Sequence, residues 1–191
     1  MRVLTILAND KKKSLNRFLF DNIVIYLSNN KHNVDTLDLY QRQRDVPFYV
    51  QPKSGISITE QNLFDFPFFQ EHKERFMAAD MLVIITPIYW YSVPGILKSW
   101  FDLITNFAWK DQGTLSYPQP LHHITKAVVV ATMGMPWWYK VLVTRNVVAR
   151  QFREIFKFIG IKNYTIYEIS NVHKLTEAKA QAHLQKILQK L

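Results

Sequence analysis

The chain has 191 residues, of which 48% are hydrophobic and 20% charged, a balance typical of a globular domain and unlike that of a disordered chain. It contains no cysteine, which excludes disulfides, iron–sulfur clusters, cysteine-ligated zinc and a thiolate nucleophile. With 24 Lys and Arg against 15 Asp and Glu, the formal net charge is +9, which favours phosphorylated cofactors, nucleic acid or acidic membranes as ligands. We expect one domain over residues 1–191.

The first predicted element is a buried strand over residues 3–8, VLTILA. An unbroken apolar run of this length is typical of a central parallel strand covered on both faces. It is too short for a signal h-region or a membrane span, so we expect a cytoplasmic protein without stable membrane insertion. Ser14 then precedes apolar residues at helical spacing, which makes it the predicted N-cap of a helix.

The later elements alternate between strands and helices. The predicted strands cover residues 34–39, 81–86, 127–131 and 164–169, and the predicted helices cover residues 68–79, 94–104, 141–159 and 176–191. A polar loop without clear periodicity covers residues 41–59. This alternation predicts an α/β three-layer sandwich, in which helices cover both faces of a five-stranded parallel sheet.

In such sheets, ligands bind beyond the carboxyl ends of the strands, so the candidate site consists of residues 9–16, 87–91 and 132–139. The first loop lacks the Gly-rich pattern of a dinucleotide-binding turn or a Walker loop. It can still bind a phosphate, because a helix N-terminus presents unpaired N–H groups, while Ser14 and Asn16 add donors and three lysines add charge. The alternative is an ordinary serine N-cap beside solvated lysines.

The second loop carries three consecutive aromatic residues, Tyr89, Trp90 and Tyr91, directly after a buried strand. They predict the wall of a flat cleft suited to a tricyclic ring, whose polar edge would be bound by backbone groups. The alternative is an aromatic cluster that covers the end of the sheet.

Residues 87–98 closely resemble the NAD(P)H quinone oxidoreductase family (DT-diaphorase type) of flavodoxin-like flavoproteins. They match its Pro-x-x-Trp-aromatic-x-x-Pro-x-x-Leu-Lys pattern, and residues 14–16 match its serine- and asparagine-containing phosphate loop. The resemblance, which extends over most of the chain, implies a flavodoxin-like fold with strand order 2-1-3-4-5. It also implies FMN or FAD as cofactor, NAD(P)H as electron donor, a quinone or similar small-molecule acceptor reduced by two electrons in a ping-pong mechanism, and a homodimer.

The resemblance further implies the site residues. The cofactor-binding residues are Asn9, Lys13, Ser14, Leu15 and Asn16 in the first loop, Pro87, Ile88, Tyr89, Trp90 and Tyr91 in the second, and Thr132, Met133 and Gly134 in the third. Backbone N–H groups of the third loop would stabilise negative charge at the N1 and O2 edge of the flavin ring. Tyr139 is the catalytic candidate, because it could donate toward the same edge, and Phe107, Trp109 and Trp137 are candidate substrate contacts.

One segment and three single positions depart from the family pattern: the segment, residues 135–138 (MPWW), is bulkier than the family's run of small residues. A histidine common after the first strand is Asn9 here, and one of two tandem glycines is Met133. No histidine follows Tyr139 at the expected short distance, where this chain has Arg145. The resemblance therefore leaves the proton donor at the ring edge unassigned. These departures keep open a hypothesis of another class, a flavodoxin-like binding or regulatory module without turnover that acts on a membrane transporter or on nucleic acid.

Other functions find less support in the sequence. Adjacent His122 and His123 lack nearby carboxylates at metal-ligand spacing, and no Gly-x-Ser-x-Gly elbow is present for a serine hydrolase. We expect no bound metal and no nucleic-acid partner. The broad apolar surface predicted for residues 96–104, together with the aromatic run at 107–109, predicts a protein partner that covers it.

Overall fold

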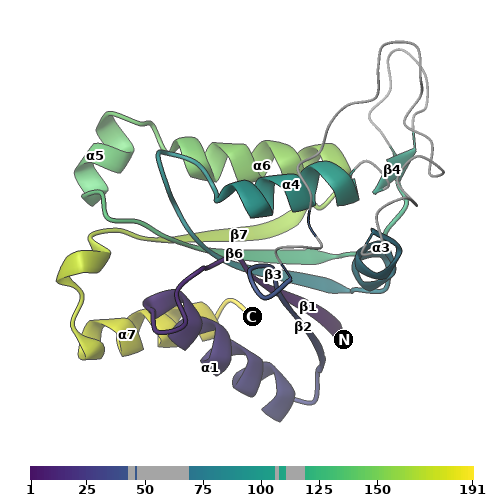
Figure 1. The fold of residues 1–191 in the computed structure, drawn as a ribbon, viewed down its shortest axis with the longest axis horizontal. Helices are drawn as coiled ribbons and strands as arrows, with labels where there is room; N and C mark the ends of the chain where they lie inside the picture. The colour runs from purple at the N-terminus through teal and green to yellow at the C-terminus, as the bar shows by residue number, and fades with distance from the viewer. Residues whose placement is uncertain (43–45, 47–68, 106–107, 111–118) are drawn as a thin grey trace.

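Five parallel strands form the central sheet of the computed structural model, which describes residues 1–42, 46, 69–105, 108–110 and 119–191 (Figure 1). The strands are β1 (Arg2–Leu7), β2 (Asn33–Asp38), β3 (Met81–Pro87), β6 (Lys126–Thr132) and β7 (Asn163–Ile169). Their spatial order is β2-β1-β3-β6-β7. This order confirms the predicted 2-1-3-4-5 arrangement, because β4 and β5 form a separate two-stranded sheet.

Helices cover both faces of the sheet, so the predicted three-layer sandwich is confirmed (Figure 1). One face packs against α1 (Leu15–Asn29) and α7 (Glu177–Leu188), and the other against α3 (Phe69–Met77), α4 (Gly95–Ile104) and α6 (Val147–Ile159). The strands supply alternate residues to the two cores, as the pleat requires. None of the helices in the described ranges is long and apolar enough to cross a membrane.

The predicted helix ends are confirmed at three positions. Ser14 caps α1, since its hydroxyl accepts a hydrogen bond from the N–H of Arg17 at 3.2 Å. Thr176 caps α7 in the same way. Gly160 ends α6 in the left-handed region, with φ of 86°, a conformation that glycine adopts without a steric penalty.

The single helix predicted over residues 141–159 is wrong. The structure has a short helix, α5 (Trp137–Leu142), then a turn, and then α6. The Thr144 hydroxyl donates back to the Lys140 carbonyl at 2.8 Å, and Arg145 and Asn146 both adopt positive φ, so the chain leaves the helical path there. As a result, α5 projects beyond the carboxyl ends of the strands (Figure 1).

The apolar surface of α4 is used within the chain. Its large side chains, including Leu97, Trp100 and Phe101, are almost fully buried against the sheet and the neighbouring helices. The prediction that a protein partner covers this surface is therefore wrong for α4, and the aromatic side chains of the run at 107–109 lie outside the described residues. The periodicity identified an apolar helix correctly, but a helix in a three-layer sandwich can bury a broad face in its own domain.

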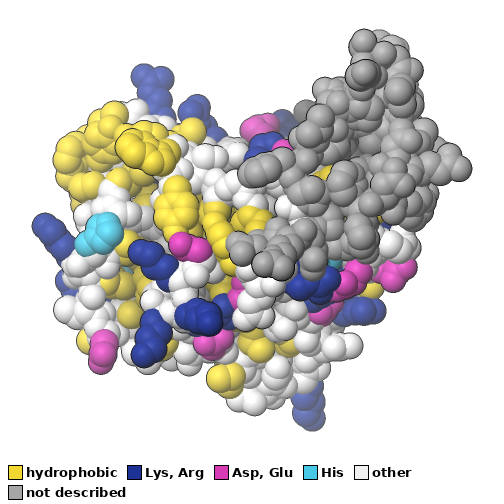
Figure 2. Space-filling model, viewed as in Figure 1, with side chains coloured by type: hydrophobic (Ala, Val, Ile, Leu, Met, Phe, Trp, Pro, Cys, Tyr) yellow, Lys and Arg dark blue, Asp and Glu magenta, His cyan; other side chains and the backbone are white. Residues whose placement is uncertain are grey.

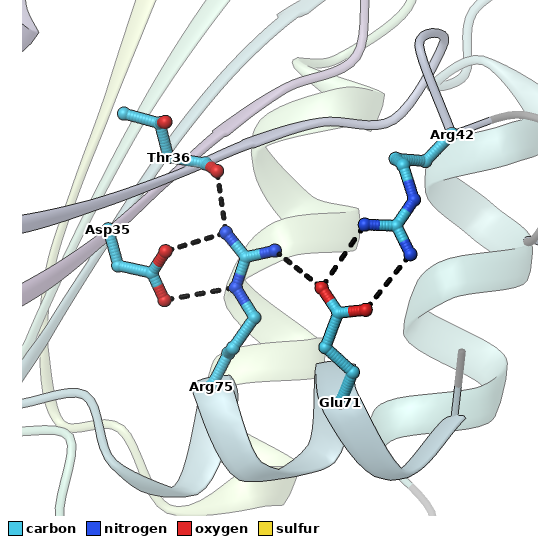
Figure 3. Close-up of polar contacts among 5 residues, drawn as sticks. All are labelled: Asp35, Thr36, Arg42, Glu71 and Arg75. Atoms are coloured by element: carbon cyan, nitrogen blue, oxygen red, sulfur yellow. Dashed lines mark hydrogen bonds and ion pairs between the residues drawn. The ribbon is translucent and has the colours of Figure 1, made fainter. Parts of the chain in front are cut away.

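A network of charged side chains connects α3 to the edge strand β2 (Figure 3). Arg75 binds both carboxylate oxygens of Asp35, at 2.6 and 3.0 Å, and also donates to the Thr36 carbonyl. Glu71 joins Arg75 to Arg42, whose hydrogen bond holds the pKa of the Glu71 carboxyl below its ordinary value. Bidentate pairs of this kind fix orientation as well as distance, so α3 is held against β2.

A short antiparallel pair lies at the amino ends of the parallel strands. It consists of β4 (Trp109–Lys110) and β5 (Gln119–Pro120). Pro120 packs against Gly160, just before β7 begins. This pair is therefore at the end of the sheet opposite to the candidate site (Figure 1).

Candidate functional site

Three loops begin side by side at the carboxyl edge of the sheet, because β1, β3 and β6 are neighbours. Backbone pairing continues past the strands: the Ala8 N–H donates to the Ile85 carbonyl at 2.9 Å, and the Ile88 N–H donates to the Thr132 carbonyl at 2.8 Å. The structure thus brings together the three candidate loops at the position where parallel α/β sheets bind ligands.

A chain of side-chain hydrogen bonds links the first loop to the third. Asn9 donates to the Ser14 hydroxyl at 2.9 Å, Asn16 donates to the Asn9 side-chain oxygen at 3.3 Å, and Thr132 donates to the Asn16 side-chain oxygen at 3.0 Å. Asn9, Asn16 and Thr132 are 4%, 4% and 5% exposed. Buried polar groups that satisfy one another are rigid, so Asn9 and Asn16 shape the site with their side chains.

The start of α1 is the cationic part of the site. Lys11, Lys12 and Lys13 are exposed immediately before the cap residue Ser14. The first N–H groups of a helix have no partner within it, and they carry a partial positive charge. Lysine side chains and free N–H groups at one turn form a suitable set of donors for a phosphate.

An open cavity of about 740 Å³ adjoins this turn, between the starts of α1 and α7. Its lining comes from both helices and from the segment before α7: Ser14, Leu15, Phe18, Val172, Leu175, Thr176, Glu177, Ala178, Ala180 and Gln181. Leu15, which was predicted to bind a cofactor, therefore borders open space at the cationic turn.

The second loop is a tight hairpin with aromatic residues at its tip. Tyr89 and Ser92 exchange both backbone hydrogen bonds, at 2.9 and 3.0 Å. Trp90 and Tyr91 lie between them with φ of 47° and 65°, the signs required by a type I′ turn. Trp90 is 93% exposed. The hairpin therefore presents aromatic side chains to the solvent in a backbone conformation that aromatic residues rarely adopt.

Tyrosine hydroxyls connect this hairpin to the other two loops. The Tyr89 hydroxyl donates to Asp10 at 3.1 Å, and burial together with this bond raises the pKa of Tyr89 to about 12. The Tyr91 and Tyr139 hydroxyls are 3.2 Å apart, and their rings stack with centroids 6.5 Å apart. This hydrogen bond raises the pKa of Tyr139 above its ordinary value. The catalytic candidate Tyr139 thus lies beside the aromatic hairpin.

In the third loop, the backbone N–H and the side chain of Met133 both have partners within the protein. The Met133 N–H donates to the Ile169 carbonyl at 2.9 Å, and the Met133 side chain is buried in the core. Both groups are used within the protein, whereas the backbone of the next residue, Gly134, is exposed.

The helix α5 and the turn that follows it carry exposed apolar side chains next to the third loop. Trp137 is 64% exposed and Leu142 is 72% exposed, and Trp138 and Val143 are also exposed. Figure 2 shows hydrophobic side chains gathered at the end of the molecule where α5 lies. We call these residues, with Val141, the α5 patch.

Of the three predicted substrate contacts, the structure describes the whole of Trp137 and only the backbone of Trp109. Phe107 lies outside the described residues, and so does the side chain of Trp109. The backbone of Trp109 belongs to β4, at the opposite end of the sheet. Trp137, in contrast, lies on α5 beside the third loop.

One residue at the site was missed by the sequence analysis. His173 lies against Gly134, although 39 residues of sequence separate the two. It belongs to the loop after β7, whose carboxyl end lies at the same edge as those of β1, β3 and β6. Spacing in the sequence could not reveal this contact. Ligands bind beyond the carboxyl ends of parallel strands, so including the loop after the predicted strand at 164–169 would have brought His173 into the candidate site.

The positive φ at the hairpin tip predicts a stability change. Trp90→Asn should raise the free energy of unfolding by about 1 kcal/mol, because asparagine tolerates the left-handed region. The exposed indole has few packing contacts, so its removal should cost little stability. Urea denaturation measures the change. Tyr89→Asn is the matched control and should lower stability, since Tyr89 bonds Asp10. A Trp90→Asn protein no more stable than the wild type would contradict the strain.

Comparison with known proteins identifies the family. A family model described as a flavodoxin-like fold matches residues 1–191. An FMN-dependent NADH:quinone oxidoreductase of Coprothermobacter proteolyticus is 28% identical over 173 residues, which cover 86% of this chain and 84% of that protein. An uncharacterized NAD(P)H oxidoreductase of Bacillus subtilis is 32% identical over 77 residues, and there the match covers 40% of this chain and only 29% of the relative.

Among solved structures, the fold is similar to that of an NAD(P)H:quinone oxidoreductase from Methanothermobacter marburgensis. The TM-score is 0.73 at 23% sequence identity, and the match covers 99% of this chain and 94% of that one. At this identity the likeness concerns the fold alone. The family model, which matches residues 1–191, carries the assignment: the chain belongs to the flavodoxin-like fold family.

Proposed function

We propose that the protein is a flavin-dependent oxidoreductase that transfers two electrons from NADH or NADPH to a quinone or a similar electrophile. The proposed cofactor is FMN or FAD, and the two substrates would bind in turn at the same place, as in a ping-pong mechanism. The extended match to an FMN-dependent NADH:quinone oxidoreductase supports this proposal. The high positive charge favours NADPH as the donor, because NADPH carries an additional phosphate.

The observation that carries the proposal is the fixed arrangement of a cationic helix start and an aromatic hairpin at one sheet edge. The Ser14–Asn9–Asn16–Thr132 hydrogen-bond chain holds the first loop to the third. The Tyr91–Tyr139 hydrogen bond links the second loop to the third. A flavin nucleotide has the same two parts, a phosphate and a flat aromatic ring, so these donors and rings fit it.

Each group of residues has a distinct part in binding. Lys13 and the first N–H groups of α1 would hold the phosphate, and Pro87, Ile88 and Tyr89 would form the floor against which the ring lies. Trp90 and Tyr91 would exclude water from the ring. Bound flavin would supply the hydride chemistry.

Tyr139 would act as a hydrogen-bond donor at the edge of the ring. Its hydroxyl is oriented by Tyr91, and this contact raises its pKa above the ordinary value. Either hydroxyl can donate in the hydrogen bond between Tyr139 and Tyr91, so Tyr139 can donate its single proton to the ring edge when Tyr91 is the donor between them. The Gly134 backbone N–H lies on the same loop and would donate beside it.

The visible spectrum of the purified protein tests this function. After addition of FMN or FAD and removal of the excess, we expect a retained absorption band at about 450 nm that bleaches with NADPH and returns with the quinone menadione. The Lys13→Glu variant should bind FMN about tenfold more weakly, a loss of about 1.4 kcal/mol, whereas Lys162→Glu, an exposed control at the amino end of β7, should bind it as the wild type does.

The same experiment separates the enzyme from the regulatory module. Flavin that is retained but not bleached by either nicotinamide would favour the module without turnover. Failure to retain either flavin would contradict the proposed function. Equal losses in the two lysine variants would show that overall charge, rather than the α1 turn, binds the phosphate.

We further propose that two copies of the chain pair through the α5 patch. Exposed tryptophans and aliphatic residues on one short helix form a surface of the kind that a subunit interface covers. Because α5 follows the third loop and its Tyr139 contacts Tyr91 of the second, pairing there would place each candidate site beside the interface.

Light scattering at low micromolar concentration should give the mass of a dimer. Leu142→Lys should shift the protein toward the monomer, since the charge would be buried in the interface. Ile25→Lys is the matched control, because Ile25 is exposed at 57% on α1, and it should remain dimeric. A wild-type protein of strictly monomeric mass would contradict the pairing.

A further inference from the structure

The segment after β7 lies across the third loop and is fixed there by backbone bonds. The Asn171 N–H donates to the Met135 carbonyl at 3.1 Å, and the Val172 N–H donates to the Met133 carbonyl at 3.2 Å. Asn171 adopts φ of 56°, which turns the chain so that the short 3-10 helix η2 (Val172–Lys174) follows. The position of His173 is therefore fixed by backbone hydrogen bonds between its own segment and the third loop.

His173 occupies the space that a side chain at position 134 would need. A Cβ atom built on Gly134 would lie 2.6 Å from His173 Nε2 and 3.0 Å from its Cδ2. Real Cβ atoms do not approach that closely, so the imidazole packs directly on the bare backbone of Gly134. Gly134 is thus a glycine because of a close approach rather than a positive φ.

The imidazole keeps its hydrogen-bonding capacity in this position. His173 is exposed, and no hydrogen bond of its ring to another described residue is found. The ring therefore lies on the exposed part of the third loop, with Nε2 nearest to the Cβ position of Gly134 and the rest of the imidazole open to a ligand.

We propose that His173 is a cofactor-contacting residue that donates a hydrogen bond to the N1 and O2 edge of the flavin ring. The inference rests on the proposed function. It follows from the placement of an available imidazole on Gly134, the part of the third loop that would meet this edge. His173 would thereby supply, from the loop after β7, the donor that the sequence lacks at a short distance after Tyr139.

The charge on the flavin determines what such a donor does. Two-electron reduction places negative charge on the N1 and O2 edge, and a histidine that donates there binds an anionic edge more strongly than a neutral one. Removal of the donor should therefore weaken binding of reduced flavin more than binding of oxidised flavin. A histidine that merely fills space over Gly134 would affect both forms equally.

Two substitutions separate the donor from the packing. His173→Phe keeps a flat ring over Gly134 but cannot donate, and His173→Gln keeps an N–H donor without the ring. His123→Phe is the matched control, because His123 is exposed near Asp80, at 3.7 Å, at the amino ends of the strands. For each protein, the dissociation constant of oxidised FMN is measured by fluorescence quenching, and the reduction potential of bound FMN by spectroscopic titration.

We expect His173→Phe to weaken reduced FMN about tenfold relative to oxidised FMN, which lowers the two-electron potential by about 30 mV. His173→Gln should restore most of the difference, and His123→Phe should match the wild type. If His173→Phe left the potential unchanged, or if Gln and Phe lowered it equally, the donor role would be overturned. A wild-type protein that retained no flavin would instead contradict the proposed function itself.

Discussion

The candidate site depends on one buried chain of hydrogen bonds, from Ser14 through Asn9 and Asn16 to Thr132. A parallel sheet brings the ends of its strands to the same edge, but it does not fix the loops that follow them. Here amide side chains connect the end of β1, the start of α1 and the end of β6. In a buried setting each of these groups would be costly to leave unpaired, so the loops have little freedom. The cationic start of α1 is thereby held in a constant relation to the third loop.

The exposed parts of the site differ from this rigid base. Trp90 and Tyr91 occupy left-handed backbone positions at a hairpin tip, and the α5 patch leaves large apolar side chains in solvent. Both features lower the free energy of unfolding, and neither adds buried contacts that would stabilise the fold. Local strain and exposed aromatic surface of this kind gather at binding sites, which fits the proposed contacts of the hairpin with a flat ring and of α5 with a second subunit. The same edge of the sheet therefore combines a cationic turn held by buried hydrogen bonds with an exposed aromatic hairpin.

The sequence allowed much of the fold to be predicted, because buried strands such as Met81–Pro87 are continuous apolar runs and Ser14 is a typical N-cap. It could not show the break between α5 and α6, which depends on a back-bonded threonine and on two residues with positive φ. It also placed Trp109 at the site, although β4 lies at the other end of the sheet. The contact of His173 with Gly134 arises from tertiary pairing of two loops, which no local pattern encodes. The resemblance predicted the chemistry of the loops, while the structure showed which of their groups are exposed.

The most direct test of this account is amide hydrogen exchange, followed by mass spectrometry, with and without FMN. If flavin binds where we propose, exchange should slow in residues 9–16, 87–92 and 132–139 and in the segment that carries His173, because a ligand there would order these loops. The amino-end segments near β4 and β5 should exchange at the same rate in both samples. Protection confined to other parts of the chain, or no protection at saturating FMN, would contradict the central claim that this edge of the sheet is a flavin site.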